Sequence, residues 1–410
     1  MKSIMVIADG LGGRPTDLDG KTCLQVAETP EIDDLLASRG AGGMIDPIGP
    51  GVRPGSDTAH LSLFGYDPYQ CYTGRGVFEA AGIGMDLTED DVCFRTNFGT
   101  VDEEGNIKDR RAGRISEGQD QLEEALSSLK SKKYPEVEVR FKRSTEHRGA
   151  LCLRGPDLGG EVTPTDPHEL GIPIPDSTGE DESSEKTAEI LNEVTHQASK
   201  ILSDHPLNEK RKEQGKLPAN AILSRGAAKY PNVTSVEEKY GVTASVVAAG
   251  ALYIGVARVA GMEFKEAEGA TGTVDSKIIN KAKVGLDELD KGKDMVFLHF
   301  KGADNASHDH DAEAKVKFIE KVDETFGWLK ENIDWEETHL SFAGDHTTPI
   351  QYGDHVADPV PVMVAGPSVR NDALEEFDEY SCRDGGMGRF SGNLLPITLS
   401  YSNLIPKFGA

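Results

Sequence analysis

The sequence predicts an α/β fold in which helices cover both faces of a buried core sheet. Apolar runs of strand length occupy residues 3–8, 295–300 and 339–343, near the two ends of the chain. Residues 188–201 and 316–329 carry apolar side chains at helical spacing, which is typical of helices that pack on a sheet. Buried strands that alternate with amphipathic helices indicate a layered α/β core.

A segment with a different sequence pattern lies between the two ends of the chain. Beyond about residue 87, short strand-like pieces alternate with turns, and the stretch 164–185, rich in Pro, Asp, Ser and Glu, predicts a linker or exposed loop. A chain of 410 residues is also longer than a typical domain with a single hydrophobic core. We therefore predict an inserted domain within a discontinuous host. The predicted domains are residues 1–87 and 180–410 for the metal-binding α/β domain, and residues 88–179 for a smaller, substrate-covering α+β domain.

Local signals place the individual elements. Thr29 and Pro30 are typical of a helix start, as the N-cap and the first helical residue. Glycines in the segment 9–15 allow backbone to approach a ligand closely. In chain order, the predicted elements are strand 3–8, helix 30–38, a helix beginning near Ser56, strand 92–95, helix 119–129, strand 136–141, a helix from Ser184, strands 220–226, 242–249 and 295–300, helix 316–329, and strands 339–343 and 358–364.

Side chains that bind metal ions follow several predicted strands. The strand 295–300 leads into Lys301-Gly-Ala-Asp-Asn-Ala-Ser-His-Asp-His-Asp311, which we expect to be one short loop. A carboxylate four residues before an imidazole can direct both groups to one cation. Open α/β sheets bind ligands beyond the carboxyl ends of their strands, although a single Asp there is more often a turn or capping residue. The repeated pattern favours a metal site with the ligands Asp9, Asp304, His308, Asp345, His346 and His355.

Ser56 lies in the segment Arg53-Pro-Gly-Ser-Asp-Thr-Ala-His60, which predicts a turn followed by a helix. A serine hydroxyl at a helix N-terminus lies in the positive field of the helix dipole, which favours an alkoxide or an attached phosphate. A simple N-cap is the alternative. A neighbouring cation would favour the nucleophile, because coordination lowers the pKa of a hydroxyl.

Charge limits the classes of partner. The net charge is −26, from 70 acidic and 44 basic residues, and this excess argues against nucleic acid. An anionic substrate would need clustered basic residues, which occur mainly between residues 110 and 148. The candidates are Arg110, Arg111, Arg114, His147 and Arg148, whereas Lys142 and Arg143 are equally explained by surface ion pairs.

Cysteine usage and hydropathy indicate the compartment. The five cysteines are widely spaced and contain no Cys-x-x-Cys pair, so we expect free thiols in a reducing environment. No apolar stretch approaches the roughly twenty residues that span a bilayer. We therefore expect a cytoplasmic protein that contacts no membrane.

A set of motifs extends over nearly the whole chain in a recognisable order. They are Asp9-Gly-Leu-Gly12, Arg53-Pro-Gly-Ser-Asp-Thr-Ala-His60, Tyr72-Thr-Gly-Arg-Gly76 with Glu79-Ala80, Asp109-Arg-Arg-Ala-Gly-Arg114, Glu146-His-Arg148, Asp166-Pro-His168, Arg225-Gly226, Glu238-Lys-Tyr-Gly241, Lys301 to Asp311, Gly344-Asp-His346, His355 with Asp358-Pro-Val-Pro361, and Lys407-Phe-Gly-Ala410. With these motifs the chain resembles the archaeal-type, 2,3-bisphosphoglycerate-independent (cofactor-independent) phosphoglycerate mutases of the alkaline phosphatase superfamily. Three residues depart from the pattern, Gly13, Ser307 and His310, and His310 could compete with His308 for a metal.

The resemblance implies an alkaline-phosphatase-like core and a site for two divalent ions, such as Mn²⁺, Mg²⁺, Co²⁺ or Zn²⁺, with no 2,3-bisphosphoglycerate requirement. It further implies that Ser56 is the nucleophile and that Lys239 and Arg225 take part in catalysis. One ion would be held by Asp304, His308 and His355, and the other by Asp9, Ser56, Asp345 and His346.

The implied activity is the interconversion of 3-phosphoglycerate and 2-phosphoglycerate in glycolysis and gluconeogenesis, through a phosphoserine intermediate. The alternatives are a phosphatase or another phosphotransferase of the same superfamily, including a homoserine-kinase-like enzyme, because these share the metal site and differ in the cleft. A non-enzymatic scaffold would have no reason to keep Ser56 together with the complete ligand set.

Overall fold

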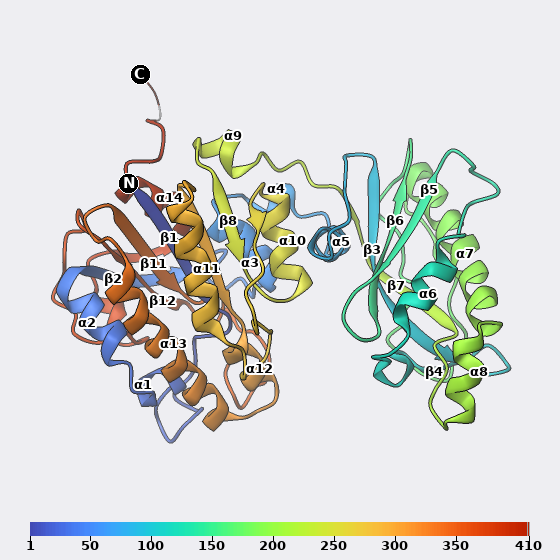
Figure 1. Ribbon diagram of the computed structural model, residues 1–410, viewed down its shortest axis with the longest axis horizontal. Helices are drawn as coiled ribbons and strands as arrows, with labels where there is room; N and C mark the ends of the chain where they lie inside the picture. The colour runs from blue at the N-terminus through green and yellow to red at the C-terminus, as the bar shows by residue number, and fades with distance from the viewer. Residues whose placement is uncertain (408, 410) are drawn as a thin grey trace. The chain divides into compact units, whose positions relative to one another are not determined.

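The computed structural model describes residues 1–407 and 409, and the chain forms two compact units. Unit 1 comprises Met1–Cys71 and Val233–Ala410, and unit 2 comprises Tyr72–Asn232. The chain therefore passes from unit 1 into unit 2 and back (Figure 1). Phe408 and Ala410, in the C-terminal motif, lie outside the described residues.

Unit 1 contains an eight-stranded mixed sheet with the order β13-β2-β12-β11-β1-β10-β8-β9. The central strands β11, β1, β10 and β8 are parallel to one another, and β12 runs antiparallel to β11 and β2. The strands are β1 (Lys2–Ala8), β2 (Gly40–Asp46), β8 (Ala244–Val247), β9 (Glu263–Phe264), β10 (Met295–Phe300), β11 (Thr338–Ala343), β12 (Val360–Ala365) and β13 (Gly388–Ser391).

Helices cover both faces of this sheet. Ile4, Val6 and Ala8 of β1 share one apolar core with side chains of α1, α2, α11 and α13. Met5 and Ile7 point to the opposite face, since side chains alternate along a strand, and they are also fully buried. The helices of unit 1 are α1 (Cys23–Val26), α2 (Pro30–Arg39), α3 (Ser56–Leu63), α4 (Pro68–Cys71), α9 (Val236–Tyr240), α10 (Ala251–Val259), α11 (Ile278–Asp290), α12 (Gly302–His308), α13 (Ala312–Asn332), α14 (Leu394–Tyr401) and the 3₁₀ helix Cys382–Asp384.

The three central strands end at the same level. Ala8 of β1 is paired with Phe300 of β10, and Ile7 is paired with Ala343 of β11. Because these strands are parallel, the segments that follow them leave from one edge of the sheet.

Unit 2 is built on a five-stranded antiparallel sheet. Its long strand β3 pairs with β4, β6 and β7, and β5 pairs with β6. The elements of unit 2 are α5 (Gly76–Gly82), β3 (Asp91–Val101), β4 (Ile107–Asp109), the 3₁₀ helix Ala112–Arg114, α6 (Gln119–Leu126), β5 (Glu138–Arg143), β6 (Arg148–Arg154), α7 (Glu182–Ser203), α8 (Pro206–Glu213) and β7 (Ala221–Lys229). An α/β host with an inserted α+β segment, as the sequence predicts, is confirmed. Among residues 1–407, no helix is long and apolar enough to cross a bilayer.

Unit 2 is wider than the predicted segment 88–179. Before it, α5 packs against β3, and after it β7 forms a ladder along β3. Between them, α7 contributes Ile190, Leu191 and Val194 to the apolar core of unit 2. The amphipathic pattern of α7 reveals a buried face, but it contains no information about which sheet that face covers.

Two local predictions differ from the structure. The segment expected to be a loop after β10 contains a short helix, α12, in which Ala303 and Ala306 are good helix formers. The expected polar linker also contains fully buried groups, since Asp166 has no exposed surface. The Asp166 carboxylate accepts hydrogen bonds from two arginines, and these contacts hold the segment against the sheet of unit 2.

Candidate metal centre and basic cluster

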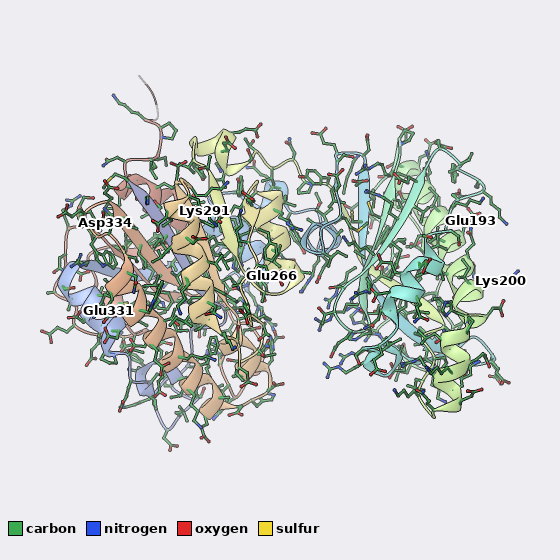
Figure 2. All side chains as sticks on the ribbon, in the orientation of Figure 1. Glu193, Lys200, Glu266, Lys291, Glu331 and Asp334 are labelled. Carbon is green, nitrogen blue, oxygen red and sulfur yellow. The ribbon has the colours of Figure 1, made fainter. Side chains whose placement is uncertain are left out.

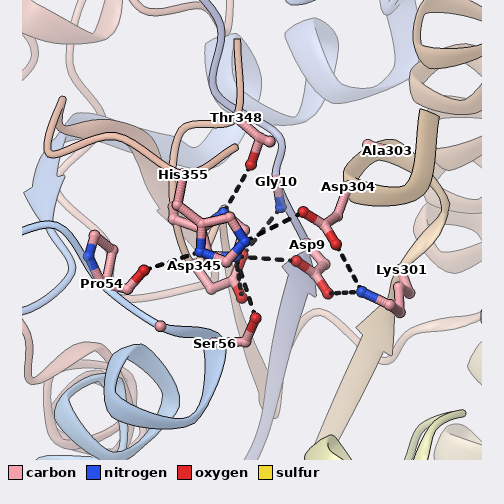
Figure 3. Close-up of polar contacts among 12 residues, drawn as sticks. Asp9, Gly10, Pro54, Ser56, Lys301, Ala303, Asp304, Asp345, Thr348 and His355 are labelled. Carbon is pink, nitrogen blue, oxygen red and sulfur yellow. Dashed lines mark hydrogen bonds and ion pairs between the residues drawn. The ribbon is translucent and has the colours of Figure 1, made fainter. Parts of the chain in front are cut away.

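The predicted metal ligands of unit 1 converge at the edge where β1, β10 and β11 end. Asp9 directly follows β1, Asp304 lies on α12 after β10, and Asp345 and His346 follow β11 (Figure 3). All four residues are at most 2% exposed. The last of the predicted imidazoles, His355, joins them from the segment before β12, with its Nε2 atom 3.6 Å from Asp304 Oδ1.

The helical form of α12 explains the Asp-x-x-x-His spacing. Residues four apart lie on the same face of a helix, one turn from each other. The Nε2 atom of His308 accordingly lies 3.2 Å from Asp304 Oδ1.

Each of the three predicted imidazole ligands has its Nδ1 atom in a hydrogen bond. His308 Nδ1 donates to the carbonyl oxygen of Gly353 at 2.8 Å, and His355 Nδ1 donates to that of Pro54 at 2.9 Å. His346 Nδ1 shares a hydrogen bond of 2.9 Å with the Thr348 hydroxyl. A hydrogen bond at one ring nitrogen sets the tautomer, so the Nε2 atoms of His308 and His355 carry the lone pair that a metal needs.

The carboxylates present open oxygens to these nitrogens. Asp9 Oδ1, Asp304 Oδ1 and Asp345 Oδ2 are buried and accept no well-formed hydrogen bond from any residue that the structure describes. The Nε2 atom of His346 lies 3.3 Å from Asp9 Oδ1 and 3.4 Å from Asp345 Oδ2. Buried carboxylate oxygens are expensive to leave without a partner, so the arrangement fits bound cations.

Three possible ligand groups can be distinguished among the described residues, and one of them consists of His60, His299 and Asp345. Asp304, His346 and His355 bring ligand atoms within 4.8 Å of one another, as do Asp9, Asp345 and His346. Oxygen and imidazole ligands without thiolate suit hard or borderline divalent ions. Buried Asp and His residues that could hold a metal ion are therefore a feature of this structure, and of the predicted ligands Asp9, Asp304, Asp345, His346 and His355 belong to these groups whereas His308 does not.

Ser56 is the first residue of α3, and Gly55 is its N-cap. The simple N-cap alternative for Ser56 is therefore wrong. The Ser56 hydroxyl lies 3.3 Å from His346 Nε2, beside the open carboxylate oxygens, and Ser56 is 8% exposed. It is thus both at a helix N-terminus and next to the candidate metal ligands.

Several residues of this centre were not predicted from the sequence. Lys301 donates to Asp9 and Asp304, and Tyr253 stacks on the ring of His299 with centroids 3.9 Å apart. His60, one turn after Ser56, donates from Nδ1 to the Ser56 carbonyl oxygen at 2.6 Å. Burial lowers the pKa of His60 to about 4 and that of His299 well below its usual value, so both rings are neutral. The sequence feature that could have identified His60 is its position in the same motif as Ser56.

A cluster of basic residues lies within unit 2. Arg95 of β3 is paired across the sheet with Arg225 of β7, and Asn97 is paired with Arg148 of β6. Burial lowers the pKa of Arg95 to about 10, and the surrounding arginines contribute to this shift while Glu79 opposes it. So many cations on one sheet are typical of an anion-binding surface. Arg95 is a member of this cluster that the sequence reasoning missed.

The predicted substrate-binding residues differ in their availability. Arg110 and Arg225 are both engaged with the buried Asp166 carboxylate, and Arg110 binds it through two hydrogen bonds of 2.6 and 2.8 Å. Arg111, Arg114 and Arg148 are exposed. Arg114 has only a distant ion-pair contact, at 3.7 Å, with Glu146. The exposed arginines are therefore better placed to bind an anion from solution than the pair held by Asp166.

His147, next to Arg148, is buried. Burial, together with the charges of Arg148, Arg111 and Arg114, lowers the pKa of His147 to about 4. The imidazole is therefore neutral at pH 7, and it can donate a hydrogen bond without adding charge.

Two other predicted residues lie away from the metal ligands of unit 1. Lys239 of α9 donates to the Gly65 carbonyl oxygen and lies over the Tyr66 ring, at 4.1 Å from its centroid. Gly65 follows the C-terminus of α3, roughly 13 Å from Ser56 at 1.5 Å per residue. His310 donates from Nδ1 to the Ile350 carbonyl oxygen at 2.7 Å, and it belongs to none of the ligand groups found in the described part of the chain.

Comparisons with known proteins identify the family of this chain. A family model described as 2,3-bisphosphoglycerate-independent phosphoglycerate mutase matches residues 37–208. Two curated proteins with that name, from Methanococcus aeolicus and Thermococcus kodakarensis, are 45% and 47% identical to this chain; each match covers 100% of this chain, and 100% and 99% of the respective relative.

Solved structures give the same result. A protein from Pyrococcus horikoshii matches 100% of this chain and 99% of its own, with a TM-score of 0.86 and 40% identity. A cofactor-independent phosphoglycerate mutase from Thermoplasma acidophilum matches 98% of this chain and 100% of its own, with a TM-score of 0.72 and 34% identity. On full-length identity above 40%, this chain belongs to the family of 2,3-bisphosphoglycerate-independent phosphoglycerate mutases.

Proposed function

We propose that this enzyme interconverts 3-phosphoglycerate and 2-phosphoglycerate, in glycolysis and gluconeogenesis, through a phosphoserine on Ser56. One observation carries the proposal. The Ser56 hydroxyl lies at the N-terminus of α3 and within 3.3 Å of His346, at the centre of buried Asp and His residues. A hydroxyl needs such an environment to attack phosphorus, because it is a weak nucleophile at its ordinary pKa.

Two divalent ions would be held by the residues at this edge of the sheet. The proposed division assigns Asp304, His308 and His355 to one ion, and Asp9, Ser56, Asp345 and His346 to the other. Divalent ions at such sites lower the pKa of a hydroxyl and neutralise charge on a phosphoryl group. The open oxygens of Asp9, Asp304 and Asp345 among the described residues support bound cations at this edge, and His346 lies close enough to both carboxylate sets to contact either ion.

The protein residues have separate roles in the proposed reaction. The Ser56 oxygen forms a bond to phosphorus as the bond between phosphorus and the 3-oxygen of the substrate breaks. The freed 3-oxygen takes up the proton equivalent that the Ser56 hydroxyl loses. In the return step the 2-hydroxyl loses its proton and its oxygen bonds to phosphorus, the bond between phosphorus and the Ser56 oxygen breaks, and the Ser56 oxygen is protonated again. The N-terminal amides of α3 favour the negative charge on the phosphoserine throughout.

The basic cluster of unit 2 would bind the carboxylate and phosphate of the substrate. Its exposed members, Arg111, Arg114 and Arg148, are proposed as direct ligands, with neutral His147 as a hydrogen-bond donor. Arg110 and Arg225 are proposed to contact the substrate with the donor groups that Asp166 leaves available. The catalytic roles of Arg225 and Lys239 remain predictions. The five free thiols also support a cytoplasmic location.

Phosphorus NMR tests the proposal directly. The purified, Mn²⁺-loaded protein is incubated with 3-phosphoglycerate, and 2-phosphoglycerate and free phosphate are followed together. We expect 2-phosphoglycerate to accumulate to equilibrium with little free phosphate. Free phosphate as the main product would instead identify a phosphatase.

A variant of Ser56 tests the intermediate. Rapid acid quench should trap phosphate on the peptide that contains Ser56, and Ser56→Ala should lose activity by several orders of magnitude while it keeps its fold. Ser62→Ala, in the same helix α3, is a control that should retain activity. An active Ser56→Ala protein would show that Ser56 is not the nucleophile.

A further inference from the structure

Lys301 is a cation inside the candidate metal centre that the proposed function does not use. It lies between β10 and α12, and it is the N-cap residue of α12. Its ammonium group donates to Asp304 Oδ2 at 2.7 Å and to Asp9 Oδ2 at 3.2 Å (Figure 3). It also donates to Tyr253 Oη at 2.7 Å. An ammonium group has three donors and no acceptor, so these three contacts use all its hydrogen-bonding capacity.

Asp9 and Asp304 divide their oxygens in the same way. In each carboxylate, Oδ2 accepts from Lys301 and Oδ1 faces an imidazole nitrogen. The Oδ1 atoms are the ones that lack a well-formed hydrogen bond among the described residues. In the proposed function, on which this inference rests, the two carboxylates belong to different metal ions. One ammonium group therefore connects both ligand sets.

We propose that Lys301 is a resident cation that joins the two metal sites. It holds Asp9 and Asp304 in place before metal binds, and it leaves one oxygen of each available for coordination. Lys301 is thus a positioning residue, since its ammonium donors are already occupied by protein acceptors.

The proposal has a thermodynamic consequence. Without metal, the buried carboxylates of Asp9 and Asp304 repel one another, and Lys301, which contacts both, offsets part of this repulsion. With metal bound, the divalent ions offset it instead, and the ammonium becomes one more positive charge in the same site. Loss of the lysine charge should therefore destabilise the metal-free protein more than the Mn²⁺-loaded protein. By linkage, the variant should bind Mn²⁺ more tightly than the wild type.

This outcome separates positioning from simple packing. A lysine that only fills space would, when replaced, lower the stability of both forms equally and leave metal affinity unchanged. Loss of the positioning role should also lower kcat more than it changes KM, because freed carboxylates can rotate away from the geometry that the reaction needs. Tighter metal binding together with slower turnover is the expected signature.

The test compares metal-free and Mn²⁺-loaded forms of three proteins. They are the wild type, Lys301→Met and the control Lys315→Met. Lys315 is also a buried lysine, but its ammonium donates to the carbonyl oxygens of Gly12 and Thr348. Calorimetric titration with Mn²⁺ gives affinity and stoichiometry, and thermal unfolding gives the stability of each form. We expect about tenfold tighter Mn²⁺ binding for Lys301→Met, which corresponds to about 1.4 kcal/mol, and equal loss of stability in both forms of Lys315→Met.

Each outcome decides the question. Unchanged or weaker Mn²⁺ affinity in Lys301→Met overturns the proposal. If Lys301→Met does not fold without metal, Lys301→Gln, which keeps a polar donor without the charge, is measured in its place. Folding of either variant only when Mn²⁺ is present supports the proposal, and failure of both to fold even with Mn²⁺ overturns it. A wild-type protein that binds no Mn²⁺ would refute the metal site of the proposed function, whereas the other outcomes leave that site intact.

Discussion

Replacing Asp166 by Asn should destabilise unit 2, because this carboxylate holds two arginines together. Asp166 is fully buried, and it accepts two hydrogen bonds from Arg110 and one from Arg225. Breaking a buried ion pair by removing one partner costs about 3–5 kcal/mol. The arginine side chains are about one-fifth exposed, at 21% and 20%, so we expect a loss near the lower limit, about 3 kcal/mol.

The pKa of Asp166 sets the pH range of this effect. Burial raises the pKa of Asp166, but the hydrogen bond from Arg110 and the charges of both arginines outweigh burial and hold it below its usual value. The stabilisation from the ionised carboxylate is therefore fully present above pH 4. It is lost as the pH falls through the lowered pKa, so the wild type and Asp166→Asn should converge only in acid.

Hydrogen exchange is the appropriate assay for Asp166→Asn. Both tryptophans, Trp328 and Trp335, belong to unit 1, so fluorescence does not report directly on unit 2. Mass spectrometry should instead show faster exchange of the backbone amides in β3 and β7 at pH 7. The control Asp176→Asn removes an exposed pair with His196, at 3.6 Å, which should contribute about 0–1 kcal/mol. Unchanged exchange in β3 and β7 would refute the assignment of Asp166 as an anchor.

Three other predictions follow from the same structure. The folded pKa of His147 is lowered to about 4 from 6.5, so the folded state binds fewer protons than the unfolded state between these values. Stability should fall by about 3 kcal/mol as pH drops through this window, and a pH series of urea unfolding should show a smaller fall for His147→Asn. A Cβ atom on Gly302 would overlap the Phe318 ring. Gly302→Ala should therefore cost about 1–3 kcal/mol in thermal unfolding and weaken Mn²⁺ binding, whereas Gly327→Ala, beside the flexible side chain of Glu31, should change stability little. Exhaustive chelation should abolish mutase activity and added Mn²⁺ should restore it; full turnover with verified zero metal would contradict the metal assignment.

The sequence correctly predicted the strands and the position of the candidate site where a buried strand is followed by a polar residue. The strand expected at 295–300 is β10, with the same bounds, and the strands before Asp9 and Asp345 are β1 and β11 within one residue. Parallel central strands of one sheet must end at one edge, so their polar successors converge. The family resemblance is confirmed by full-length relatives.

The limits of unit 2 could not be obtained in the same way. The stretch 164–185 has the composition of a linker, yet Asp166 is buried within it and α7 follows as part of the same unit. The composition of a segment indicates only how exposed its residues are on average. One buried carboxylate that pairs with arginines distant in the sequence is enough to hold such a segment in place. A pairing over 56 residues, as between Arg110 and Asp166, leaves no local pattern.

Exposed and buried carboxylates differ in their need for a partner. This difference explains why the sequence analysis did not identify Lys301 as part of the site. Acidic residues are abundant on the surface of both units, and Figure 2 labels Glu193, Glu266, Glu331 and Asp334 among them. Their charge is dispersed in water, and no single partner is needed. Asp9 and Asp304 are buried, so each charge requires a partner at contact distance. Spacing in the sequence identifies the acids that could bind metal, but the cation that balances them before metal arrives is determined by the fold, through Lys301 at the end of β10.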